Sequence, residues 1–166
     1  MKEKPLGKIT VSAITARSGI NRTTFYKNYE NIDQLFNMVC LRLTRDVLRV
    51  RSSDIRTTDD LIAYGRLSYR RTIQNMDRFR LLGGSHGDMR FLWNFSNVFN
   101  TRMRHIAEHI GVTDRSIWRG IDASSGILSL RLCDAIYGDQ FKDVPLPEDI
   151  TRYQTDRSLF ENIAQS

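Results

Sequence analysis

Three observations predict that the protein is all-α. Apolar residues recur at steps of three and four along most of the 166 residues. No stretch alternates apolar and polar residues as a half-buried strand does. Capping residues and glycines divide the periodic segments, and the short connections favour antiparallel neighbours. We therefore expect two short N-terminal helices followed by a helical bundle.

The first two helices are short and clearly delimited. Thr10 is a good N-cap for the first of them. Gly19 ends this helix, because glycine readily adopts the left-handed conformation that follows a helix. Asn21 then caps a second helix over residues 22–29.

Two longer helices are expected next. Asn31 starts the third helix, and Gln34 stands three residues later, as in a capping box. An apolar stripe of helical period carries this helix to about Arg51. After a polar break, Thr58 and two aspartates start a fourth helix that ends near residue 75. One or two further turns are expected over residues 77–82.

Three more helices are predicted in the C-terminal half. A glycine-rich loop over residues 83–87 precedes the first, which covers residues 88–110. The second covers residues 113–137 and the last covers residues 148–164. The residues expected to start or stop these helices are Asp88, Gly111, Thr113 and Gly138.

The composition is that of an ordinary globular protein, with 40% apolar and 27% charged residues. No run approaches the length of a membrane span, and the polar N-terminus lacks the apolar stretch of a secretory signal. Cys40 and Cys133 lie in apolar helical patterns, which favours reduced thiols over a disulfide framework. We therefore expect a cytoplasmic protein, and nothing in the sequence calls for a cofactor.

The positive charge is concentrated near the N-terminus. Residues 1–31 hold six basic and two acidic residues, which is +4 of the total net charge of +6. A basic head on a nearly balanced body is typical of proteins that bind nucleic acid. A solvated, mildly basic surface is the alternative.

The first two helices have the pattern of a helix-turn-helix, whose second helix enters the major groove of DNA. Arg22 can donate two hydrogen bonds to guanine, and Thr23 and Thr24 offer hydroxyl groups. Lys27 lies one turn further on, within reach of phosphate. A helical corner with a polar outer face is the alternative. The residues expected to contact DNA are Thr10, Arg22, Thr23, Thr24, Tyr26, Lys27 and Asn28.

Residues 8–36 resemble the DNA-binding segment of the tetracycline-repressor-like (TetR/AcrR) family of bacterial regulators. The positions that match the family pattern are Thr10, Val11, Ile14, Gly19, Thr24, Tyr26 and Leu35. The resemblance implies a DNA-binding head over residues 1–31 and an effector-binding and dimerisation domain over residues 32–166. It also implies a homodimer on a palindromic operator, usually a repressor that responds to a small effector.

The chain departs from the family pattern in three places. Tyr29 stands where Phe is usual, and Ile32 stands where the family often has Lys. Nine residues precede Thr10, so most of the family's first helix is expected to be missing. These departures leave open an alternative, a helical dimerising interaction module whose shortened head does not bind DNA.

In the family, the last two long helices usually pair with those of a second subunit. Small residues among the apolar ones would permit close approach of such helices. The alternative is that these side chains serve only the core of their own subunit. The residues expected at a dimer interface are Ile117, Ile121, Ser125, Leu128, Leu132, Leu159, Phe160 and Ile163.

An aromatic-rich set of side chains could line an apolar effector pocket between helices, although an aromatic stripe at helical spacing equally suits a plain core. The residues of this set are Tyr69, Phe91, Trp93, Phe95, Phe99, Met103 and Trp118.

His105, Glu108 and His109 fit the short His-x-x-Glu-His signature of some zinc proteases. The match is only five residues long, and no third ligand follows at a supporting spacing. A regulatory metal site on the two histidines is the other reading of this segment. The sequence contains no nucleophile elbow and no phosphate-binding loop. We therefore expect neither an enzyme nor a bound metal.

Overall fold

A computed structural model of the chain describes residues 4–138, which form seven α-helices and two short 3₁₀ helices and contain no strand. The predicted all-α class is confirmed for these residues. No helix among them is both long enough and apolar enough to cross a membrane. The elements are η1 (Leu6–Lys8), α1 (Val11–Ser18), α2 (Arg22–Asn28), α3 (Ile32–Val47), η2 (Ser52–Asp54), α4 (Thr58–Gln74), α5 (Met76–Gly83), α6 (Arg90–His109) and α7 (Arg115–Tyr137).

Local side-chain caps fix the bounds of α1 and α2. The Thr10 hydroxyl accepts a hydrogen bond from the amide of Ala13 at 3.2 Å. The Asn21 side chain accepts one from the amide of Thr24 at 2.7 Å. Gly19 lies between the two helices with φ of 71°, in the left-handed region. The predicted caps and the predicted glycine turn are therefore confirmed.

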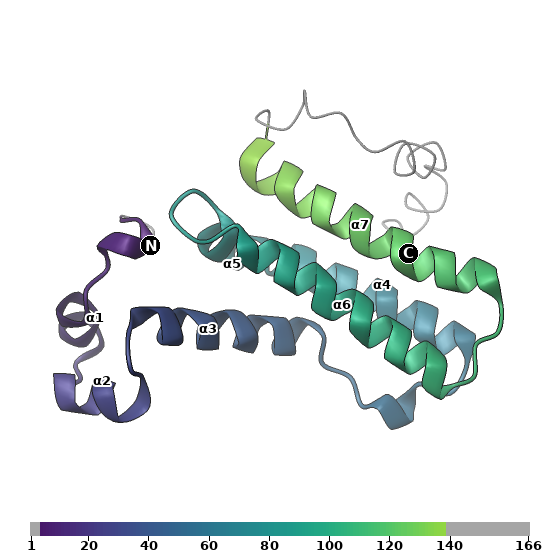
Figure 1. Cartoon of the computed structure of the whole chain (residues 1–166), viewed down its shortest axis with the longest axis horizontal. Coiled ribbons are helices and arrows are strands. Elements are labelled where there is room, and N and C mark those ends of the chain that lie inside the picture. Colours follow the sequence, from purple (N-terminus) through teal and green to yellow (C-terminus); the bar gives the residue numbers. More distant parts are fainter. Residues whose placement is uncertain (1–3, 139–166) are drawn as a thin grey trace.

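Helix α3 runs from the α1–α2 pair toward the other helices (Figure 1). Its predicted cap is confirmed, since the Asn31 side chain accepts from the amide of Gln34 at 2.8 Å. The Gln34 side chain, however, accepts from the amide of Glu30 at 2.6 Å and does not return to Asn31. The helix ends at Val47, so its predicted extension to Arg51 is wrong. Side chains from α4 and α6 bind the carbonyl groups at this end.

The N-cap of helix α4 lies one residue before the predicted one. Thr57, and not Thr58, is the N-cap, and its side chain accepts from the amide of Asp60 at 3.1 Å. The Asp60 carboxylate accepts in return from the amide of Thr57 at 3.0 Å. This reciprocal capping box decides the start of the helix, because it satisfies two unpaired amides together. Helix α5 follows directly after Asn75.

The starts of α6 and α7 also differ from the predicted caps. The Asp88 carboxylate accepts from the amide of Arg90 at 2.9 Å, but α6 begins two residues after it. Asp114, and not Thr113, caps α7, accepting from the amide of Ser116 at 2.7 Å. Gly111 and Gly138 have φ of 72° and 57°, which ends the preceding helices as predicted. The predicted helix over 148–164 lies outside the described residues.

The core lies where α6 packs against α4, α5 and α7 (Figure 1). Phe79 of α5 is fully buried and meets the rings of Phe91 and Phe95 of α6, with ring centres 5.4 and 4.7 Å apart. Burial of such large rings is the main favourable contribution to folding of these helices. Helix α3 joins this core with Phe36 and Val47. The α1–α2 pair lies at one end of the molecule, beyond the start of α3 (Figure 1).

Candidate nucleic-acid interface

One aromatic side chain anchors α2 against α1. Phe25 is 1% exposed, although α2 is only 7 residues long. The rings of Tyr26 and Tyr29 lie beside it, with ring centres 5.4 and 5.6 Å away. Because this side of α2 is held by Phe25, the opposite side of the helix faces outward.

The outward side of α2 carries polar and basic groups. Thr23 and Lys27 are four residues apart and share the face opposite Phe25, with Thr24 and Tyr26 on its flanks. All four side chains are exposed, Tyr26 by 58%. The structure thus brings these four sequence-predicted residues onto one accessible face.

Arg22 has a contact that the sequence analysis did not anticipate. Its guanidinium donates a hydrogen bond to the hydroxyl group of Ser12 on α1, and both residues are exposed. The bond joins the first turn of α2 to the first turn of α1 and leaves other guanidinium donors free. No short-range spacing signals a pair ten residues apart, so Ser12 could be found only from the arrangement of the helices.

The two remaining predicted DNA contacts already have intramolecular partners. The Asn28 amide group donates to the carbonyl of Thr24 at 2.8 Å. The Thr10 hydroxyl caps α1 through Ala13. Thr10 lies at the start of α1, at the opposite end of that helix from the Gly19 turn, and Ser12 and Ala13 in the first turn are exposed.

The segment before α1 is joined to the body of the molecule. The amide of Leu6 donates to the carbonyl of His86 at 2.8 Å, and the Leu6 side chain packs against the main core. His86 lies in the glycine-rich loop between α5 and α6. Gly87 in this loop has no room for a side chain, since a Cβ there would overlap the Leu82 carbonyl. The η1 segment and this loop lie near each other in Figure 1.

Six of the seven residues predicted for an effector pocket belong to the main core or pack against it. Phe91, Phe95, Phe99 and Met103 are buried in the core, and Tyr69 and Trp118 are half-buried, whereas Trp93 is 61% exposed. The indole of Trp118 donates to the carbonyl of Val112 at 3.1 Å, and the Arg104 guanidinium lies 5.1 Å from the centre of its ring.

A hollow of about 410 Å³ lies instead between α3 and α6. Its lining mixes apolar and polar side chains, and it includes only two residues of the predicted set. Burial, with a smaller contribution from the nearby Asp88 carboxylate, raises the pKa of the Cys40 thiol in this lining to about 12. The lining residues are Phe36, Asn37, Cys40, Leu41, Thr44, Asp88, Arg90, Phe91, Asn94, Phe95 and Val98.

The residues predicted for a dimer interface are largely engaged within this chain. Ile121, Leu128 and Leu132 of α7 are buried in its own core, and Ile117 is half-buried beside it. Ser125 is half-buried and accepts a hydrogen bond from α6. The other three, Leu159, Phe160 and Ile163, lie outside the described residues.

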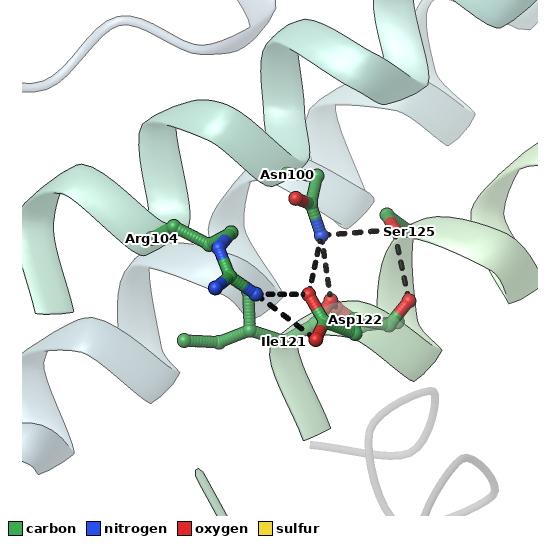
Figure 2. Close-up of polar contacts among 6 residues, drawn as sticks. Asn100, Arg104, Ile121, Asp122 and Ser125 are labelled. Atoms are coloured by element: carbon green, nitrogen blue, oxygen red, sulfur yellow. Dashed lines mark hydrogen bonds and ion pairs between the residues drawn. The ribbon is translucent and has the colours of Figure 1, made fainter. Parts of the chain in front are cut away.

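Figure 2 shows the polar contacts that bind α7 to α6 around Ser125. The Asn100 amide group of α6 donates to the Ser125 hydroxyl at 3.1 Å and to the Asp122 carboxylate at 3.2 Å. Arg104 donates to the same carboxylate at 2.7 Å. These hydrogen bonds from Arg104, with a smaller contribution from Asn100, hold the pKa of Asp122 below its ordinary value. The network adds polar contacts to the apolar packing between the two helices.

His105 and His109 are exposed and share one face near the end of α6. Within residues 4–138, no three His, Cys, Asp or Glu side chains gather in a way that could hold a metal ion. The described residues therefore give the zinc-protease signature no third ligand.

The exposed face of α2 is thus the most coherent group of sequence-predicted site residues in the described part of the chain. The predicted pocket and dimer residues are divided between the core, the surface and the C-terminal segment outside the description. Comparisons of the chain with protein-family models, with curated proteins and with solved structures find no match.

Proposed function

We propose that the chain is a sequence-specific DNA-binding transcriptional regulator, and that α1 and α2 form a helix-turn-helix. One observation carries the proposal: α2 presents Thr23, Thr24, Tyr26 and Lys27 on an exposed face while Phe25 anchors its other side. Hydroxyl and ammonium groups on the outer face of a second helix suit contacts with base edges and phosphates. The net charge of +4 on residues 1–31 favours the same partner.

In this proposal, α2 enters the major groove with its first turn toward the bases. Arg22 lies at the edge of that turn, where its free donors can reach guanine O6 and N7. The bond to Ser12 restricts the directions in which the guanidinium can point. Lys27, which has no hydrogen bond or ion pair to another described residue, is available to a phosphate. The exposed first turn of α1 after Thr10 offers its free amides to a second phosphate.

We further propose that the regulator acts as a homodimer on a palindromic operator, as a repressor that responds to a small effector. A single α2 reads only a few base pairs, so two copies related by a two-fold axis are expected to bind more tightly and selectively. The resemblance of residues 8–36 to the TetR/AcrR family supports this assignment. The α3–α6 hollow is the place where we propose that an effector binds, because it lies beside the helix that carries the head.

The alternative function is a helical dimerising interaction module with a head that does not bind DNA. One observation favours it: the packing that holds α1 and α2 together is small. Phe25 and Thr15 are buried there, whereas Val11 and Ile14 are only half-buried. Helices of 8 and 7 residues are not stable without such packing, so a weakly held pair would be poorly folded before it meets DNA.

Selection from random duplex DNA at near-physiological salt, followed by sequencing of the bound pool, tests the proposal. Enrichment of a palindrome by the full chain is the expected result, and its half-site spacing would give the distance between the heads. The double variant Thr23→Ala/Lys27→Ala should lose this enrichment. Arg119→Ala is the matched control, because it also removes a positive charge, from an exposed position on α7. An unenriched pool with salt-sensitive binding would support the alternative, since only phosphate attraction would remain.

A further inference from the structure

Helix α3 ends without the glycine that commonly follows a helix. The last turn of any helix leaves carbonyl groups without partners inside the helix, and a glycine in the left-handed conformation commonly follows to satisfy them. No such glycine follows Val47, and the C-cap residue Leu48 has φ of −90°. The carbonyls at this end are therefore left to water or to partners from elsewhere in the molecule.

Three side chains from two other helices supply those partners. The Tyr64 hydroxyl of α4 donates to the carbonyl of Leu48 at 3.0 Å. Nη1 of Arg71, two turns further along α4, donates to the carbonyl of Arg49 at 2.6 Å and approaches that of Val47 at 3.4 Å. Nη2 of Arg102 on α6 donates to the carbonyl of Val50 at 3.0 Å. Four successive carbonyls are thus bound, that of Val47 at the end of α3 and those of the three residues that follow it.

Tyr64, Arg71 and Arg102 are together called the clamp. Its two arginines carry positive charge, which suits the C-terminal end of a helix. A helix carries partial negative charge at its C-terminus, which attracts cations. Neither arginine forms an ion pair with an acidic residue among those described, so the carbonyls are their main electrostatic partners. Nε of Arg102 is buried without a hydrogen bond, and Tyr64 is only 3% exposed. The Tyr64 side of the clamp therefore lies in the interior, whereas Arg71 and Arg102 are half-buried and the bond from Arg71 to the Arg49 carbonyl is exposed.

One turn of α6 connects this clamp to α7. Arg102 points to the end of α3, whereas Asn100 and Arg104, two residues before and after it, bind Asp122 of α7 (Figure 2). Side chains two apart on a helix lie on different faces, so both contacts can be made together. The end of α3 is thus connected directly to α4 and α6, and through the same turn of α6 to α7.

We propose that Tyr64, Arg71 and Arg102 are positioning residues that fix the direction of α3 and, through it, the place of the α1–α2 head. Helix α3 has 16 residues and is therefore about 24 Å long. A tilt of about 10° at the clamp would move its far end by about 4 Å, close to one base-pair step. The consequence for DNA binding rests on the proposed function, whereas the restraint on α3 does not.

Hydrogen exchange followed by mass spectrometry on the full chain tests the restraint without DNA. Arg71→Met should speed exchange of the amides over residues 44–51 at least tenfold and leave α6 and α7 unchanged. Arg70→Met is the matched control, because Arg70 is the exposed neighbour on the same helix, and it should change nothing. Arg71→Lys should partly restore protection, since an ammonium group can bind one carbonyl. Tyr64→Phe, which removes only a hydroxyl group, should give a smaller local increase.

Two exchange results would overturn the proposal. Unchanged exchange over residues 44–51 in Arg71→Met would show that the clamp restrains nothing. A uniform increase across all helices would show that Arg71 only stabilises the fold.

A second readout separates this proposal from the proposed function. If the wild-type chain selects a palindrome, Arg71→Met should accept half-site spacings one base pair longer or shorter with less than a threefold penalty. An unchanged spacing preference would refute the effect on the head. If the wild-type chain selects no DNA sequence, the proposed function fails, and the exchange experiment still decides whether the clamp exists.

Discussion

Replacing Phe25 with alanine is expected to unfold α1 and α2 while α4 to α7 stay folded. Phe25 is fully buried, and two tyrosine rings pack beside it. Truncation of a buried Phe to Ala typically costs about 3–5 kcal/mol. Helices as short as these gain little stability of their own and depend on packing. The loss should therefore exceed what the remaining contacts of the pair can offset.

The magnitude can be read from amide exchange. Because about 1.4 kcal/mol corresponds to a factor of ten, exchange over residues 11–28 should accelerate by roughly two to three and a half orders of magnitude. Hydrogen exchange of the full chain, resolved by peptide, measures this directly. Thr23→Ala is the control on the exposed side of the same helix, and it should change stability by no more than about 0.5 kcal/mol.

Either of two results would refute this reasoning. Wild-type protection over residues 11–28 in Phe25→Ala would mean that contacts other than this ring hold the pair. Simultaneous loss of protection in α4 to α7 would mean that the head and the body unfold as one unit, contrary to the separate packing described for them.

Three further outcomes are expected. Gly87→Ala should lower the free energy of unfolding, measured in urea, by about 1–3 kcal/mol, because the added Cβ would overlap backbone. The control Gly120→Ala, at an open helical position, should be neutral or stabilise by up to about 1 kcal/mol. Equal unfolding midpoints for the two variants would contradict this. Arg104 holds the folded-state pKa of Asp122 below its ordinary value of 3.8, so the stability advantage of wild type over Asp122→Asn, under about 1 kcal/mol, should be complete at pH 7 and disappear as the pH falls through the lowered pKa. An advantage that persists at pH 2 would show that charge is not its source. Arg22→Ala should relax preference at one base pair by about 1–3 kcal/mol in a binding series, and equal weakening on every sequence would indicate a phosphate contact.

Features set by neighbouring residues could be predicted from the sequence. Thr10, Asn21 and Asn31 cap helices as expected because their partners stand three residues away in the chain. Gly19 and Gly138 end helices because left-handed backbone favours glycine whatever surrounds it. The exposed face of α2 likewise follows from a period of 3.6 once Phe25 is assigned to the buried side.

Features set by distant residues could not be predicted in this way. The sequence predicts α3 to continue to about Arg51, whereas the residues after Val47 leave the helix and are bound by Arg71 and Arg102, which lie far along the chain. Thr57 and Asp114 displaced Thr58 and Thr113 as caps, since each adjacent pair offers two good capping residues and side-chain geometry decides between them. Seven aromatic and apolar residues suggested a pocket, but periodicity cannot distinguish a lined cavity from a filled core.

The hydrogen bond from Leu6 to His86 has a consequence for the order in which the chain folds. The loop that it closes contains about 80 residues, and closing so long a loop is slow and entropically costly compared with forming α1 and α2 locally. Its acceptor is in place only after α5 and α6 have packed around Gly87. During synthesis, α1 and α2 therefore emerge early but attach to the body only after α5 and α6 have formed. A nascent chain stopped before His86 would carry a head with no fixed position.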